Sequence, residues 1–281
     1  MGVVLLKRKL TSFQIIILGF SGVILFGTFL LMLPFSSRSG LATPFSDALF
    51  TSTSAVCVTG LIIHDTATYW SAFGQLVILL LIQIGGMGVI TVAASFAMIS
   101  GRKISLMQRS TMQEAISAPK VGGIVRLTGF IVRVTLVTEL LCAAVMAPVF
   151  CRDFGKINLW MALFHSVSAF CNAGFDLLGV RAPFSSLTSY AANPVINFTI
   201  MFLIVFGGIG FLTWDDIRTN RLHLRKYRMQ SKVILCTTAV LLIVPAMYFY
   251  FFEFDDLTRK ERLLSSLFQA VTPQKGRCAV P

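Results

Sequence analysis

Two stretches of this sequence, ALFTSTSAVCVTG at residues 48–60 and ALFHSVSAFCNAG at residues 162–174, follow one pattern. Ala, Leu, Phe, Ser, Ser, Ala, Cys and Gly recur in the same order and at the same spacing. Each stretch is followed by a second matching block, IGGMG at residues 84–88 and FGGIG at residues 206–210. Because two ordered blocks recur together, we interpret the chain as an internal repeat.

The composition places this repeat in a membrane. Hydrophobic residues make up 56% of the 281 positions and charged residues 13%, and the mean hydropathy is +0.80. A soluble domain carries roughly 25% charged residues. Five apolar stretches approach or exceed the roughly 20 residues that span a bilayer. They are residues 15–33, 76–99, 129–150, 195–214 and 233–252. The sequence therefore predicts an all-α polytopic membrane protein.

The quoted stretches overlap two short half-apolar segments, residues 46–56 and 158–170, that are too brief to cross a bilayer. Segments of 10–14 residues in this position are better interpreted as re-entrant helices. Ser46 or Asp47 can cap the first helix and Asn158 the second, because short polar side chains accept hydrogen bonds from free N–H groups. Each repeat is then a span, a pore helix and a second span.

The repeat gives the domain boundaries, with two complete units and a partial third one that is marked by LFQAVT at residues 267–272. The expected segments are a cytoplasmic N-terminus (1–12), a first repeat (13–100), a cytoplasmic linker (101–123), a second repeat (124–215), a second linker (216–230), a partial third repeat (231–273) and a divergent tail (274–281).

The net charge of +12 does not indicate nucleic-acid binding, because no soluble domain is present to carry a basic surface. Most of the basic residues lie in three clusters, at residues 7–9, 102–126 and 218–232. Basic loops remain cytoplasmic, so the N-terminus is expected inside the cell. The two short helices would then enter the membrane from outside.

A helix that enters from outside and stops within the membrane directs its C-terminal carbonyl groups, and the partial negative charge of its dipole, toward the membrane centre, which favours a cation. Glycine in the residues that follow adopts the φ angles that turn successive carbonyls inward, as in potassium-channel filters. We therefore predict a cation-selectivity filter made of backbone carbonyls, with no side-chain metal site. Its residues are Cys57, Val58, Thr59, Gly60, Cys171, Asn172, Ala173 and Gly174.

Other features have less specific interpretations. The glycines at residues 84–88 and 206–210 are expected to let helices pack closely, the alternative being a role in gating. Glu139 lies inside a span, where a charge is costly, and is expected to pair with a neighbouring helix, the alternative being contact with the ion. The three histidines share no spacing with a carboxylate, the six cysteines show no metal or disulfide pattern, and no enzyme motif is present. The chain is not expected to be an enzyme or to bind a cofactor.

Four segments resemble the Ktr/Trk/HKT potassium transporters: TSTSAVCVTGL (51–61), LIQIGGMG (81–88), FHSVSAFCNAGFDLL (164–178) and FQAVTP (268–273). The short basic start KRKLT (7–11) is most similar to the membrane subunit of bacterial Ktr systems. The resemblance implies potassium uptake across the bacterial plasma membrane through a pseudo-fourfold pore. It also implies a homodimer in membrane lipid, a cytosolic nucleotide-binding regulatory ring and stimulation of uptake by sodium.

The chain departs from this family near its end. Thr272 begins a partial third filter, but Arg277 or Cys278 stands where the family has glycine. We therefore expect that a frameshift or truncation has replaced the tail from about residue 274, and that the second span of repeat three and all of repeat four are missing. The alternative function is a non-transporting fragment that at most associates with intact subunits.

Overall fold

The computed structural model describes residues 11–99, 106–116, 123–155, 159–221, 223–254 and 257–275. These residues form helices and loops without a strand, apart from one isolated bridge between Ser37 and Trp70. The prediction of an all-α polytopic membrane protein is confirmed.

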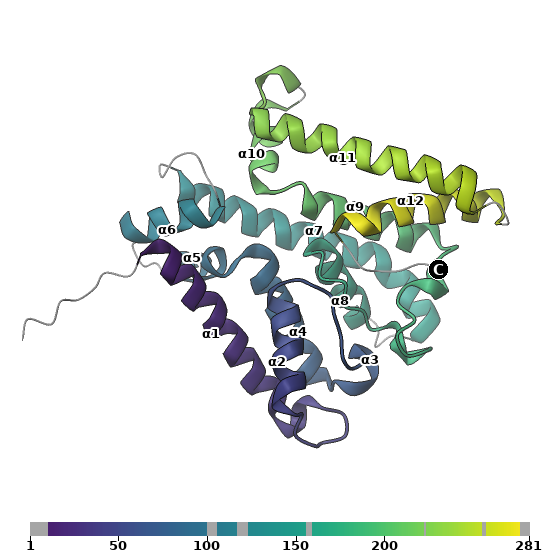
Figure 1. The fold of residues 1–281 in the computed structure, drawn as a ribbon, viewed down its shortest axis with the longest axis horizontal. Helices are drawn as coiled ribbons and strands as arrows, with labels where there is room; N and C mark the ends of the chain where they lie inside the picture. The colour runs from purple at the N-terminus through teal and green to yellow at the C-terminus, as the bar shows by residue number, and fades with distance from the viewer. Residues whose placement is uncertain are drawn as a thin grey trace, which may run out of the picture.

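The first part of the chain forms the lower part of Figure 1. Helix α1 (Ser12–Met32) is followed by the short η1 (Pro34–Ser36) and by α2 (Phe45–Val56), which packs against α1. A loop that contains α3 (Thr66–Tyr69) leads to α4 (Ala72–Met87), which packs against both α1 and α2. Helices α5 (Val89–Ile99) and α6 (Leu106–Ile116) then pack against each other and against α1.

The second part repeats this arrangement. The long helix α7 (Ile124–Phe154) packs against the short α8 (Leu159–Phe170), and both pack against α9 (Pro194–Gly208). Short turns, η3 (Leu178–Val180) and η4 (Thr188–Tyr190), lie in the loop between α8 and α9. Helix α10 (Phe211–Asn220) follows α9.

The last part contains η5 (Leu224–Lys226), α11 (Met229–Tyr248), a π-helical turn η6 (Phe249–Glu253) and α12 (Arg259–Lys275). Figure 1 shows α12 lying along α11, and α12 also packs against α9. Asp216 of α10 fixes the start of α11, because its Oδ2 accepts hydrogen bonds from the N–H of Arg228 (3.0 Å) and the hydroxyl of Ser231 (2.6 Å).

Three of the five expected spans correspond to helices long and apolar enough to cross a membrane: Ser12–Met32, Ile124–Phe154 and the continuous Met229–Glu253. The other two are each divided in the structure. Residues 76–99 form α4 and α5, which meet at Gly88, and residues 195–214 form α9 and α10, whose axes are bent by 93°. Each of these two apolar stretches therefore consists of two helices in the structure.

The physical reason for both divisions is a glycine with a positive φ angle, 84° at Gly88 and 90° at Gly210. A residue in this conformation cannot continue a right-handed helix, and glycine adopts it at little cost because it has no Cβ. Apolar composition alone does not reveal such a break.

Side chains cap the starts of several helices. The side chains of Thr11, Ser71 and Asn193 accept backbone N–H groups at the starts of α1, α4 and α9. Helix α2, however, begins after Pro44 without a side-chain cap. The expectation that Ser46 or Asp47 caps it was wrong, because both lie inside the helix, and Asn158 lies outside the described residues.

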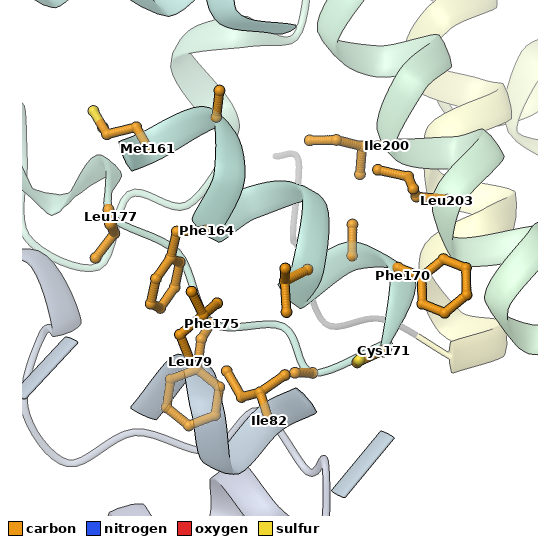
Figure 2. Close-up of a cluster of buried hydrophobic side chains, with 14 of the residues drawn as sticks. Leu79, Ile82, Met161, Phe164, Phe170, Cys171, Phe175, Leu177, Ile200 and Leu203 are labelled. Atoms are coloured by element: carbon orange, nitrogen blue, oxygen red, sulfur yellow. The ribbon is translucent and has the colours of Figure 1, made fainter. Parts of the chain in front are cut away.

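The hydrophobic core surrounds α8. Figure 2 shows Phe164 and Phe175 next to Leu79 and Ile82 of α4, while Phe170 lies toward Leu203 of α9. A helix that is apolar around most of its circumference is expected at the centre of a bundle. This packing holds the end of α8 in the interior of the molecule.

Candidate functional site

The first candidate segment, residues 57–60, leaves the end of α2. Cys57 still belongs to the helical turn, and its N–H donates to the carbonyl of Thr53 at 2.8 Å. Val58 and Gly60 then have positive φ angles, 56° and 72°. A positive φ is a genuine outlier for a β-branched residue, so the surrounding structure must hold the valine there.

The second segment, residues 171–174, has the same backbone pattern at the end of α8. Asn172 and Gly174 have φ angles of 59° and 72°. In both segments the sign of φ therefore alternates along the chain, with positive values at the second and fourth residues. The two copies of the sequence pattern adopt one local conformation.

A backbone hydrogen bond fixes each segment to its own helix. The N–H of Thr59 donates to the carbonyl of Ser54 at 3.0 Å, and the N–H of Ala173 donates to the carbonyl of Ser168 at 2.8 Å. These bonds use carbonyls of the last helical turn, which have no partner inside the helix.

The two segments lie against each other. A Cβ atom built on Gly60 would be 2.6 Å from the carbonyl oxygen of Ala173 and 3.5 Å from the Cα of Gly174. The structure thus brings together candidate residues that are far apart in the sequence. The approach is close enough that only glycine fits at position 60 without a shift of the backbone.

Two serines of the repeat anchor the segments through their hydroxyl groups. Ser54 Oγ accepts the N–H of Leu61 at 3.0 Å and the hydroxyl of Thr59 at 2.9 Å. Ser168 Oγ donates to the carbonyl of Phe175 at 2.6 Å. The two serines occupy corresponding positions. Ser54 accepts a hydrogen bond from the residue that follows its glycine, whereas Ser168 donates one to the residue that follows its glycine.

Two further serines tie each short helix to the span before it. Ser52 Oγ donates to the carbonyl of Ile24 in α1 at 2.8 Å, and Ser166 Oγ donates to the carbonyl of Glu139 in α7 at 2.7 Å. None of these four serines was assigned a role from the sequence. Their recurrence in both copies of the pattern was the signal that could have identified them.

The glycines after each segment bring a second helix against the short helix, as predicted. A Cβ atom on Gly85 would lie closer than 3.0 Å to the carbonyl oxygen of Val56, and one on Gly207 would lie closer than 3.0 Å to that of Phe170. Real Cβ atoms essentially never approach so closely. The ends of α2 and α8 are therefore each held by a glycine of α4 or α9.

Glu139 pairs with a neighbouring helix, which confirms the expectation for this residue. Its side chain is 2% exposed, and its Oε2 accepts a hydrogen bond from Gln83 Nε2 of α4 at 3.2 Å. The side-chain oxygen of Gln83, Oε1, accepts a long hydrogen bond from the sulfur of Cys171 at 4.0 Å. A chain of polar contacts thus connects α7, α4 and the second candidate segment.

The loops beyond the two segments are joined by a carboxylate. Asp65 Oδ1 accepts the N–H groups of Ala67 and Thr68 at the start of α3, and its Oδ2 accepts the N–H of Phe184 at 3.0 Å. Phe184 belongs to the loop of the second repeat. The loops on this side of the molecule therefore support each other.

Two of the histidines hold these loops, although the sequence suggested no partner for them. His64 Nε2 lies 2.9 Å from Asp47 Oδ2 of α2, and its ring stacks on Tyr69 at 3.9 Å. His165 of α8 accepts the N–H of Leu177 at 3.4 Å. The fold pairs His64 with Asp47 although the two residues lie 17 positions apart and no local spacing connects them.

A cavity of about 360 Å³ lies where both divided spans break. Gly88 and Gly210 line it together with side chains of α1, α6 and α11. Thr213 also lines it and is buried, and its hydroxyl has no hydrogen-bond partner in the described part of the chain.

The structure places the candidate residue of the third repeat inside a helix. Thr272 lies in α12, at the position that corresponds to Ser54 and Ser168, and its hydroxyl donates to the carbonyl of Phe268 at 2.6 Å. Arg277 and Cys278, the basis of the expectation about the tail, lie outside the described residues, as do positions 1–10.

Replacement of Ser168 by alanine is expected to destabilise the protein by about 1–3 kcal/mol, because the buried carbonyl of Phe175 loses its partner. The measurement is the thermal unfolding temperature in detergent. Ser185→Ala is the control, since the Ser185 hydroxyl has no partner among the described residues. Equal unfolding temperatures for Ser168→Ala and the wild type would contradict the anchoring role.

Comparison with known proteins places this geometry in context. The sequence profile of a family described as "TrkH: Cation transport protein" matches residues 7–272. The chain is 40% identical over 274 residues to the potassium/sodium uptake protein NtpJ of Enterococcus hirae. This alignment covers 95% of this chain and 59% of the relative. It is 37% identical over 273 residues to the Ktr system potassium uptake protein B of Bacillus subtilis, in an alignment that covers 95% of this chain and 60% of the relative. The chain thus spans about three fifths of the length of these curated relatives.

Proposed function

The chain belongs to the TrkH family of cation transport proteins, and from this membership we propose that it is a pore-forming subunit for potassium uptake across a bacterial plasma membrane. The family consists of transporters and not of enzymes, in agreement with the sequence analysis. Both relatives described above carry names that state potassium uptake. Transport in this proposal is passive and follows the electrochemical gradient of the ion.

The observation that carries the proposal is the pair of adjacent segments at the ends of α2 and α8. Each helix ends in the interior of the molecule, and each is followed by a segment in which the sign of φ alternates. Irregular backbone at membrane depth is tolerated only where it is packed in protein or lines a watery cavity. We infer that these segments line the ion path.

In this proposal residues 57–60 and 171–174 form two sides of the selectivity filter. The C-terminal ends of α2 and α8 contribute partial negative charge, and the backbone carbonyls of the segments replace part of the hydration shell of K⁺. The serine hydroxyls and the glycine contacts hold these carbonyls in place. Further repeats around the same axis would complete a pseudo-fourfold ring.

We also propose the orientation of the chain and its partners. The basic linkers would lie in the cytoplasm, so α2 and α8 enter from outside and the cavity at Gly88 and Gly210 lies on the inner side. A homodimer, a cytosolic nucleotide-binding regulatory ring that docks on the basic linkers, and stimulation by sodium rest on the family resemblance.

Expression in cells that lack their own potassium uptake tests the proposal. The 281-residue chain is compared with a version that is extended by the C-terminal part of the Bacillus subtilis relative. The extended version is expected to restore growth at low external potassium and to raise uptake of labelled rubidium. Failure of both versions, with both present in the membrane, would refute the proposed function. Uptake by the extended version alone would support the fragment alternative for these 281 residues.

A further inference from the structure

A second cavity, of about 500 Å³, lies between the two repeats at the side where α4 and α8 begin. Apolar side chains from both repeats line it, including Leu76 of α4, Met161 of α8 and Leu177 of the following loop. Its volume lies within the range of roughly 300–1,000 Å³ that is usual for small-molecule sites. The cavity is separate from residues 57–60 and 171–174.

The polar groups in this cavity are already satisfied, with one exception. Gln75 Nε2 donates to the carbonyls of Thr66 (3.4 Å) and Trp70 (3.2 Å), and its Oε1 accepts the indole N–H of Trp160 at 2.9 Å. Arg38 is the single charged residue among the described residues that line the cavity. In the part of the chain that the structure describes, its guanidinium has no ion-pair partner.

The surroundings of the cavity indicate contact with lipid. Leu76 is 41% exposed, and Phe73 and Leu80 on the same helix are also exposed. Exposed apolar side chains on a membrane protein face acyl chains. Trp160 lines the cavity together with Arg38, and the carbonyl of Tyr69 accepts the backbone N–H of Arg38 at 2.8 Å. Tryptophan and tyrosine are enriched where the membrane meets water. Arg38 is thus placed at the depth of lipid head groups.

We propose that this cavity binds an anionic phospholipid, with an acyl chain between α4 and α8 and the phosphate on Arg38. A guanidinium binds phosphate oxygens with two parallel hydrogen bonds. The side chain of Gln75 needs no hydrogen bond from the ligand, because its hydrogen bonds are made within the protein. An apolar acyl chain can therefore fill the space beside it. A zwitterionic lipid offers the same acyl chain, but its cationic group offsets the attraction of the phosphate for Arg38.

The occupant joins the two repeats at the level of their outer loops. Residues from the first repeat (Arg38, Leu76) and from the second (Trp160, Leu177) contribute to one site. Binding of a lipid here therefore stabilises the interface between repeats, whether or not the protein conducts ions. The proposal goes beyond potassium uptake and does not depend on it.

Thermal unfolding of the full chain in detergent tests this site, with dioleoyl phosphatidylglycerol added as the anionic lipid and dioleoyl phosphatidylcholine as the neutral one. Saturating phosphatidylglycerol is expected to raise the unfolding temperature by about 5 °C, and phosphatidylcholine by much less. Soluble glycerol phosphate has the head-group charge without the acyl chain, and it is expected to give no shift.

Arg38→Gln is expected to remove at least half of the shift with phosphatidylglycerol, while the unfolding temperature without lipid stays unchanged because Arg38 is exposed. Arg152→Gln is the matched control, since Arg152 is 75% exposed and does not line the cavity. Equal shifts with both lipids, or a full shift in Arg38→Gln, would overturn the proposal. Native mass spectrometry then checks whether phosphatidylglycerol remains bound to the wild type and is lost from Arg38→Gln.

Discussion

Replacement of Gly207 by alanine is expected to remove most of the folded protein from the membrane. The added Cβ would overlap the carbonyl oxygen of Phe170, the last residue of α8. The backbone of α9 fixes the position of the Cβ, and the carbonyl oxygen belongs to the backbone of α8, so no side-chain rotation can relieve the overlap. Overpacking usually costs about 1–3 kcal/mol, and this site is expected to lie at the upper end of that range or above it.

The measurement for Gly207→Ala is the yield of monodisperse protein in detergent, together with its unfolding temperature. Gly129→Ala is the matched control, because Gly129 also lies inside a membrane-spanning helix but a Cβ there meets no atom within 4 Å. Alanine is about 1 kcal/mol more favourable than glycine in a helix, so the control is expected to be neutral or stabilising. Wild-type yield and stability for Gly207→Ala would contradict the close approach of α9 to α8.

Replacement of Gly60 or Gly174 by aspartate is expected to abolish ion uptake while the protein remains in the membrane. Both glycines have a φ angle of 72°, which strains other residues by roughly 1–2 kcal/mol. A side chain on Gly60 would in addition displace the carbonyl of Ala173. The expected defect is local, because residue 60 is only half-buried and follows α2 instead of packing between two helices.

Uptake of labelled rubidium and the amount of protein in isolated membranes are measured together, in the extended version described above. Gly40→Asp is the control, since Gly40 has nearly the same φ angle, 70°, but open space around it and a position outside the candidate segments. Gly40→Asp is expected to retain uptake. Normal uptake in both Gly60→Asp and Gly174→Asp would refute the filter assignment, whereas loss in all three variants would indicate general strain.

The sequence predicted those parts of the structure that repetition and apolar composition determine. The two copies at residues 48–60 and 162–174 led to two short helices followed by matching segments, and the structure contains both. Burial of Glu139 against a neighbouring helix followed from the cost of a charge inside a span. The roles of residues 57–60 and 171–174 in selectivity remain predictions.

Other features depended on information that no local pattern holds. Gly88 and Gly210 look like their neighbours in the glycine blocks, but only they have positive φ angles and divide a span. Which glycine breaks a helix and which one packs against a carbonyl is decided by the tertiary fold. The pair of His64 with Asp47 and the contact of Asp65 with Phe184 likewise join residues that only the folded chain brings together.

The unequal anchors of the two segments have a genetic consequence. In a channel assembled from four identical subunits, one altered codon changes the ring at four places at once. In the proposed ring, one chain supplies all four sides, so a change in one codon alters only one of them. Ser54 accepts a hydrogen bond from the chain beyond its glycine, whereas Ser168 donates one, so the sides have already diverged. Selection can therefore change each side of the ion path separately. The four sides of the proposed pore can differ in their residues and hydrogen bonds.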